Sequence, residues 1–175
     1  LAAFCQRLID QYRATPADNL MTRLIQAQEE DETLTDAEVI ATCTLVLFAG
    51  HETTANLISN ALRALLRHPE QLALLRDGRV PIRSAVEELL RFDGPGKAMM
   101  RVLSEDRELG GCQLKAGQRV FLILASANHD PRVFDAPAEL RLDREHNPHI
   151  AFGQGVHHCM GSSLARMEAS VALPR

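Results

Sequence analysis

The sequence predicts a mainly α-helical fold with a small β-sheet region. Apolar residues recur at helical spacing over the first two thirds of the chain, and two-residue alternation replaces that spacing near residue 98. A long stretch with prolines and no periodicity follows at residues 129–149. The 175 residues are 46% hydrophobic and 24% charged, which is typical of one globular domain.

The first helix is predicted over residues 1–12, where apolar residues form one stripe, and the polar segment 27–32, AQEEDE, is interpreted as an exposed loop. A long helix is predicted over residues 35–66, because Thr35 and Glu38 form a capping box and no breaker precedes Pro69. At 1.5 Å per residue it would be about 46 Å long. Its apolar segment, residues 39–49, is expected to be buried. Two further helices are predicted over residues 69–75 and 82–92.

Short strands are predicted within three segments, residues 98–106, 107–117 and 118–128, with turns at Gly110–Gly111 and Ala116–Gly117. Residues 129–149 are predicted to form a long irregular coil, and coils of this length are usually functional. The loop FGQGVHHCMG, residues 152–161, comes next, and a last helix is predicted from about Met160.

Charge and cysteine content exclude several classes of function. The net charge of −4 offers no basic surface for nucleic acid. No apolar run is long enough to span a bilayer, and no leader-like segment is visible, so we expect a cytoplasmic protein without a membrane partner. The chain starts without methionine and stops within an amphipathic pattern, so we expect a fragment.

Four scattered cysteines without a CxxC pair argue against a disulfide framework or a zinc ribbon. Three of them are expected to be half-buried.

Cys159 is the exceptional cysteine, because three glycines and two histidines surround it in residues 152–161. Glycines let the backbone lie flat against a ligand, and the start of the next helix favours a thiolate. Such a thiolate could ligate a haem iron, act as a nucleophile with His157 or His158, bind zinc, or be a structural cysteine. Haem is favoured because it needs one axial protein ligand, whereas zinc needs three or four convergent ligands. The other interpretations stay open at this point.

AGHETT, residues 49–54, lies in the middle of the longest predicted helix. Glycine there costs about 1 kcal/mol relative to alanine, and Glu52 places a charge in a segment expected to be buried. A wet helix face or an internal ion pair explains the motif as well as a local opening does. In such an opening, Glu52 and Thr53 would face a ligand over the small surface of Ala49 and Gly50.

A third motif, ELLR, places Glu88 and Arg91 three residues apart on one helix face, where they can pair. Alone it is weak, because most such pairs are solvated. The chain carries three motifs in a fixed order: a Gly-acid-Thr helix, then Glu-x-x-Arg, then FxxGxxxCxG. This order resembles the cytochrome P450 family of haem-thiolate monooxygenases. The last motif is matched at every fixed position: Phe152, Gly155, Cys159 and Gly161.

The coil also resembles the family's meander, which it matches at Pro131, Phe134, Pro137 and Arg144. Leu140 stands where an aromatic residue is usual, which affects local packing only. The AGHETT version resembles soluble bacterial members. The resemblance implies that residues 1–175 are a partial cytochrome P450 domain, from the helix before the long distal helix to the helix after the cysteine loop. The N-terminal helices and the C-terminal end would be missing.

The resemblance also implies how haem b would be bound. Cys159 would be the axial iron ligand, with Phe152 packed beside its sulfur. The amides of glycines, Gly153 and Gly161 among them, would donate hydrogen bonds to the sulfur. Arg101 and His157 match positions that bind haem propionates in the family, whereas His158 is interpreted as a bystander.

On the other side of the haem, Ala49 and Gly50 would line the distal face. Thr53 and Glu52 would deliver protons to oxygen there. A structural triad would tie one helix to the meander behind the haem: Glu88, Arg91 and Arg144.

The implied reaction inserts one atom of O2 into a small organic substrate. Electrons would come from NAD(P)H through a ferredoxin or flavodoxin redox partner and its reductase, because no flavin or nicotinamide motif is visible. The partner would dock on the face near Cys159. Two alternatives remain: a haem-binding but catalytically incomplete fragment, and a hydrolase with Cys159 as nucleophile. The hydrolase leaves the other two motifs unexplained.

Overall fold

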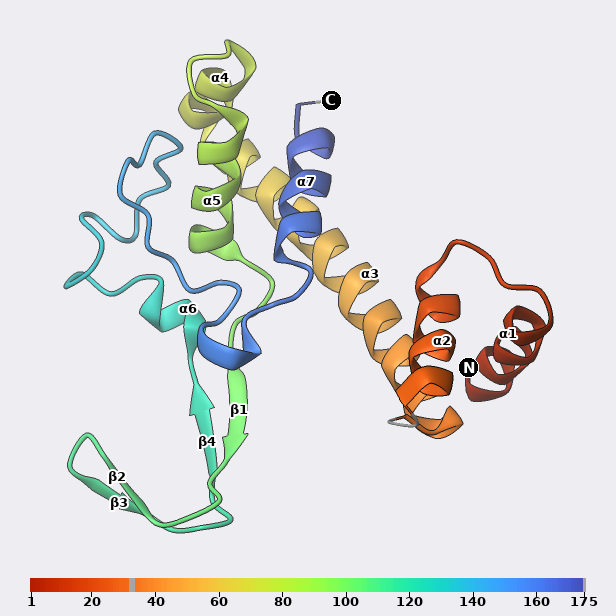
Figure 1. Ribbon diagram of the computed structural model, residues 1–175. Coiled ribbons are helices and arrows are strands. Elements are labelled where there is room, and N and C mark those ends of the chain that lie inside the picture. The colour runs from red at the N-terminus through yellow and green to blue at the C-terminus, as the bar shows by residue number, and fades with distance from the viewer. Residues whose placement is uncertain (32–33, 175) are drawn as a thin grey trace. The chain divides into compact units, whose positions relative to one another are not determined.

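The computed structural model describes residues 1–31 and 34–174, and it confirms a mainly α-helical fold with small antiparallel sheets (Figure 1). The chain divides into two compact units, Leu1–Glu52 and Thr53–Arg175. The long predicted helix is confirmed as α3, Asp36–Arg67, and it contributes residues to both units. None of the described helices is both long and apolar enough to cross a membrane.

The first unit contains α1, Ala2–Ala14, then α2, Leu20–Asp31, and the first part of α3. Its core is formed by one buried residue from each helix: Ile9, Ile25 and Val39. The predicted capping box is confirmed, since the amide of Thr35 donates to Glu38 Oε2 at 2.7 Å and the amide of Glu38 donates to Thr35 Oγ1 at 3.3 Å. These reciprocal bonds fix where α3 begins.

Helix α2 corrects the expected loop at residues 27–32, of which residue 32 lies outside the described residues. The side chain of Asn19 caps this helix by accepting a hydrogen bond from the amide of Thr22 at 2.8 Å. Ile25 then packs in one buried cluster with Ile9 and Val39. Packing of this apolar face outweighs the polar composition at the end of the helix.

The expected burial of residues 39–49 is wrong for most of the segment. Val39 is buried, but Leu45, Leu47 and Phe48 are each more than half exposed, because α1 and α2 pack only near the start of α3. Glu52 is exposed as well, so it is not a buried charge. Helix α3 continues through residues 49–54 without a break, so the suggested local opening is also wrong.

The second unit packs three helices against the later part of α3. They are α4, Pro69–Arg76, α5, Ile82–Asp93, and α7, Ser162–Ala172. Leu65 of α3 and Leu89 of α5 belong to one buried cluster, and Leu57, Leu90 and Ala169 belong to another. These contacts confirm the predicted helices and bring the end of the chain beside α5 (Figure 1).

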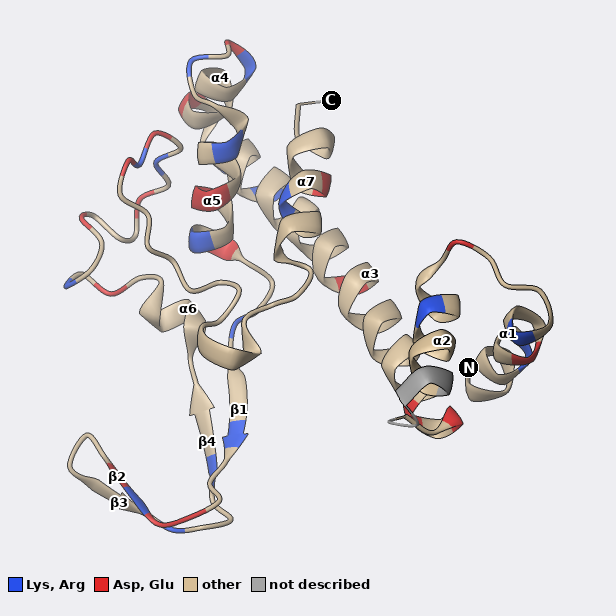
Figure 2. Cartoon of the chain, viewed as in Figure 1, with Lys and Arg blue, Asp and Glu red and all other residues tan. Residues whose placement is uncertain are grey.

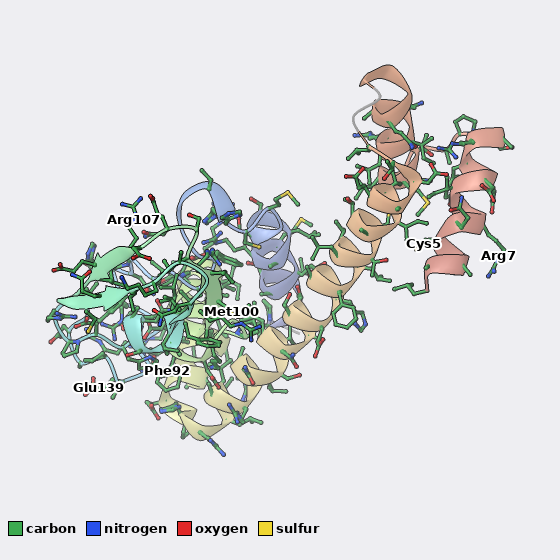
Figure 3. All side chains as sticks on the ribbon, turned by 90° about the horizontal axis from the view of Figure 1, so that it is seen from below. Cys5, Arg7, Phe92, Met100, Arg107 and Glu139 are labelled. Atoms are coloured by element: carbon green, nitrogen blue, oxygen red, sulfur yellow. The ribbon has the colours of Figure 1, made fainter. Side chains whose placement is uncertain are left out.

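The β region consists of two antiparallel pairs rather than one sheet. β1, Met99–Val102, pairs with β4, Arg119–Leu122, and β2, Arg107–Leu109, pairs with β3, Cys112–Leu114. Gly110 and Gly111 form the predicted turn with φ of 57° and 80°, which favours glycine. Cys112 is exposed in this hairpin, against the expectation of a half-buried residue. Figure 3 labels Met100 on β1, Arg107 on β2 and Cys5 on α1.

The last predicted strand segment, residues 118–128, is only partly correct. Its end forms the short helix α6, Leu124–Ala127, in which Leu124 is buried against the rest of the unit. The described residues between α6 and the short 3₁₀ helix η1, Gly155–His157, contain no other helix or strand, which confirms the irregular coil. Helix α7 begins two residues later than predicted, after Gly161.

Candidate functional site

The cysteine loop joins the coil to α7 and holds Cys159 at the surface of the second unit. The amide of Cys159 donates to the carbonyl of Phe152 at 3.0 Å, which closes the loop. Gly153 and Gly155 adopt φ of 70° and 75°, a region that side chains rarely enter. The loop therefore depends on both glycines for its shape.

The face of this loop around the thiol is open and apolar. Val156 and Met160 are 98% and 89% exposed, and a Cβ on Gly155 would meet no atom within 4 Å. Cys159 is exposed, and its Sγ has no hydrogen-bond partner among the described residues. A thiol presented in this way is available to a ligand with a large apolar surface.

The two neighbouring histidines do not pair with this thiol. His158 Nδ1 lies 3.3 Å from the carbonyl oxygen of Gly153, and His157 is exposed in η1. Among the side chains that the structure describes, no three of His, Cys, Asp or Glu converge as metal ligands. The geometry thus gives no support to a Cys–His nucleophile or to a zinc site.

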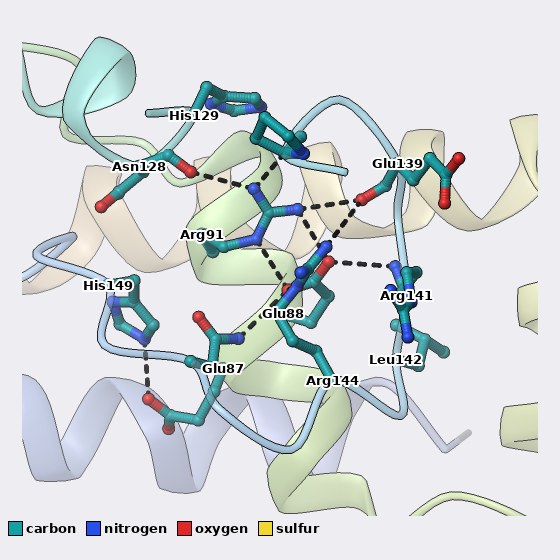
Figure 4. Close-up of polar contacts among 12 residues, drawn as sticks. Glu87, Glu88, Arg91, Asn128, His129, Glu139, Arg141, Leu142, Arg144 and His149 are labelled. Carbon is teal, nitrogen blue, oxygen red and sulfur yellow. Dashed lines mark hydrogen bonds and ion pairs between the residues drawn. The ribbon is translucent and has the colours of Figure 1, made fainter. Parts of the chain in front are cut away.

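Glu88 and Arg91 of α5 lie at the centre of a buried polar network, in which both side chains have no exposed surface (Figure 4). Glu88 accepts two hydrogen bonds from Arg91, each at 2.8 Å, and one from Arg144 Nε at 3.0 Å. The three residues predicted to form a triad are therefore in contact. Acidic and basic residues alternate along α5 (Figure 2), but this pair faces inward.

The network reaches further than the three predicted residues. Arg91 also donates to three backbone carbonyls of the coil at 2.8–2.9 Å: Asn128, Pro137 and Glu139. The side chain of Asn147 and the amide of Arg141 donate to Glu88 at 3.1 and 3.0 Å. Sequence reasoning missed these partners, because most of them are backbone groups and a backbone group carries no residue signature. The network fixes the coil that leads into the cysteine loop.

A second polar cluster, also missed from the sequence, connects α5, the coil and α7. Glu87 accepts hydrogen bonds from Arg166 Nε at 2.6 Å, from Arg166 Nη2 at 3.0 Å and from His149 Nε2 at 2.8 Å. The Arg166 guanidinium lies over the Phe152 ring, 4.4 Å from its centroid. Burial opposes ionisation of Glu87, but the bonds from His149 and Arg166 outweigh it and lower its pKa to about 2.

The remaining predicted residues lie on exposed surfaces. Ala49, Gly50 and Glu52 are exposed on α3 in the first unit, where Glu52 borders an apolar hollow with Leu47, Phe48 and others. Thr53, the next residue of the helix, is exposed as well. Arg101 is exposed on β1, where its Nη1 donates to the carbonyl of Met100 at 2.9 Å. Exposure leaves these side chains accessible to a ligand.

Comparison with known proteins identifies the family. The family model described as Cytochrome P450 matches residues 2–77 and 82–175. The chain belongs to the cytochrome P450 family. Among its relatives, the biotin biosynthesis cytochrome P450 of Bacillus subtilis (strain 168) is 44% identical over 171 residues, which are 98% of this chain and 43% of that protein. Nocardicin C N-oxygenase of Nocardia uniformis subsp. tsuyamanensis is 47% identical over 175 residues, 99% of this chain and 44% of that protein.

The fold agrees with solved cytochrome P450 structures. A structure of P450BioI in complex with acyl carrier protein ligated to hexadec-9Z-enoic acid matches with a TM-score of 0.93 and 42% identity. That match covers 99% of this chain and 45% of the solved chain. The chain thus carries a cytochrome P450 fold over a partial region, and it spans less than half the length of these relatives.

Members of the cytochrome P450 family bind haem b. The residues of this chain fit that cofactor. The Cys159 thiol in the glycine loop is exposed, and the exposed apolar side chains of Val156 and Met160 lie near it in the same loop. A flat apolar macrocycle needs such a surface and one axial ligand. His157 and Arg101 add exposed groups suited to carboxylates.

Proposed function

We propose that residues 1–175 are part of a cytochrome P450 domain that binds haem through Cys159 and catalyses monooxygenation of a small organic substrate. The observation that carries this proposal is the open, unpartnered thiol of Cys159 in a glycine loop within FxxGxxxCxG. The buried network around Glu88 supports it, because it fixes the coil that leads into that loop. When bound, haem supplies the activation of dioxygen and its transfer to an organic molecule.

The chain's own residues would divide the remaining tasks. The Cys159 thiolate holds the cofactor, with Phe152, Gly153 and Gly161 around it. Arg101 and His157 hold the propionates. Ala49 and Gly50 give the distal face its small surface.

The side chains of Glu52 and Thr53 would hold the protons that are delivered to oxygen. Electrons would come from NAD(P)H through a ferredoxin or flavodoxin and its reductase, docking near Cys159. The names of the relatives mention biotin and nocardicin C, two different compounds, so the substrate class stays at small organic molecules.

Isotope-labelled dioxygen tests the proposed reaction. The haem-loaded full-length protein that contains this chain would be supplied with NAD(P)H, a ferredoxin and its reductase, and a library of organic substrates. We expect one labelled oxygen atom in a product and the other in water. Oxidised product without label, or haem binding without any oxidation across the library, would contradict the reaction and favour a haem-binding module.

Thr53→Ala should uncouple the reaction rather than stop electron use. Thr53 is exposed on an unbroken helix, so alanine leaves the fold intact but removes the hydroxyl that would hold a proton. We expect normal haem content, continued consumption of NAD(P)H and a shift from product to hydrogen peroxide. The measurement is the ratio of product to NAD(P)H consumed, with Thr54→Ala as the control. An unchanged ratio would count against this role.

The isolated 175 residues should associate and show little monooxygenase activity. Leu45, Leu47 and Phe48 are all more than half exposed within one turn of α3, and apolar patches of this kind favour association. Light scattering and size-exclusion chromatography of the purified chain test the first point, and turnover with haem and a redox partner tests the second. Well-coupled turnover by a monomer would show that this stretch is sufficient by itself.

A further inference from the structure

The Glu87 cluster, which consists of Glu87, His149, Arg166 and Phe152, is not explained by the residue roles given so far. Two side chains, His149 of the coil and Arg166 of α7, meet at the carboxylate of Glu87 on α5, and Arg166 lies over an aromatic ring of the cysteine loop. Phe152 is directly connected to Cys159, whose amide donates to its carbonyl at 3.0 Å. The cluster thus reaches the residue that would hold haem.

The hydrogen bonds fix the orientation of the arginine. Arg166 uses Nε and Nη2 toward both oxygens of Glu87, a bidentate arrangement that sets the plane of the guanidinium. The central carbon of the guanidinium, Cζ, lies over the Phe152 ring at 4.4 Å from its centroid, within range of a cation–π contact. Only about a third of each of the Arg166 and Glu87 side chains is exposed, so solvent competes only partly with these contacts.

His149 holds the carboxylate from the other side. The amide of Ala151 donates to His149 Nδ1 at 3.2 Å, so Nδ1 is the acceptor and Nε2 carries the hydrogen that is donated to Glu87. The Arg166 guanidinium is the member of the cluster that lies over the ring.

We propose that Arg166 is a positioning residue that acts through Phe152: held by Glu87, its guanidinium fixes the ring and places positive charge beside the Cys159 loop, which raises the haem reduction potential. This inference rests on the proposed haem binding by Cys159. A fixed cation near the cofactor stabilises the reduced, more negative state. The two hydrogen bonds to Glu87 favour arginine, because a lysine ammonium is not planar and is more strongly hydrated.

The test is a redox titration of the haem-loaded full-length protein carrying Arg166→Gln, in the native background and in Phe152→Leu. Arg166→Gln removes the positive charge, so we expect it to lower the reduction potential in the native background. We expect a smaller shift with Phe152→Leu, since the ring over which the guanidinium lies is gone. Arg107→Gln, which removes the positive charge of an exposed Arg–Glu pair, is the matched control and should cause no shift.

Three outcomes separate the possibilities. Equal shifts in both backgrounds, or no shift in either, would overturn the role of Arg166 through Phe152. Loss of haem with an unchanged potential in the fraction that retains it would assign the cluster to stability alone and also overturn the proposal. Absence of a thiolate-ligated haem from the wild-type protein would instead refute the proposed function, so the two failures can be told apart.

Discussion

Replacing Glu88 by alanine is expected to unfold much of the second unit. Glu88 has no exposed surface and accepts hydrogen bonds from Arg91, Arg144, Asn147 and the amide of Arg141. Alanine would leave two buried guanidinium groups without their carboxylate, and breaking a buried ion pair in this way costs about 3–5 kcal/mol. This loss is large, because the free energy of unfolding of a whole domain is only about 5–15 kcal/mol.

Denaturant unfolding followed by circular dichroism measures this effect on the full-length protein, and haem content gives a second readout. Glu105→Ala is the matched control, because it removes an acid whose arginine partner, Arg107, is exposed. Surface pairs contribute about 0–1 kcal/mol, so the control should stay close to the wild type. If both variants lose the same free energy of unfolding, the buried network does not hold the coil as described.

Cys159→Ser is expected to abolish thiolate ligation of haem while leaving the protein folded. The side chain is exposed and its Sγ has no hydrogen-bond partner among the described residues, so the change should alter the free energy of unfolding by no more than about 0.5 kcal/mol. The same substitution at Cys5, which is buried, and at Cys112, which is exposed, should retain the ligation. Similar loss of haem ligation in all three variants would remove the assignment of Cys159.

Features encoded by neighbouring residues could be predicted from the sequence. Thr35 and Glu38 are three residues apart, and their capping box correctly placed the start of α3. The neighbouring pair Gly110–Gly111 correctly placed the hairpin turn, since glycine is favoured at the positive φ angles of this turn. Glu88 and Arg91 share one helix face, and the family motif joined them to Arg144.

Features that depend on contacts between distant segments could not be predicted in this way. Helix α2 was missed because its stability comes from Ile25 packing on Ile9 and Val39, although Asn19 offered a capping signal. Apolar composition suggested that Phe48 is buried, but composition does not show whether another segment covers it. Glu87 and Arg166 are 79 residues apart, and nothing in their neighbours indicates that they meet.

The carbon-monoxide difference spectrum of the reduced, haem-loaded full-length protein tests haem ligation by Cys159, because the position of its absorbance band depends on the axial ligand of the iron. Cys159 is the exposed cysteine of the glycine loop that matches FxxGxxxCxG. We predict the spectrum of a thiolate-ligated haem in the wild type and its loss in Cys159→Ser. A wild-type spectrum typical of a nitrogen ligand, or a thiolate spectrum that persists in Cys159→Ser, would show that Cys159 is not the ligand.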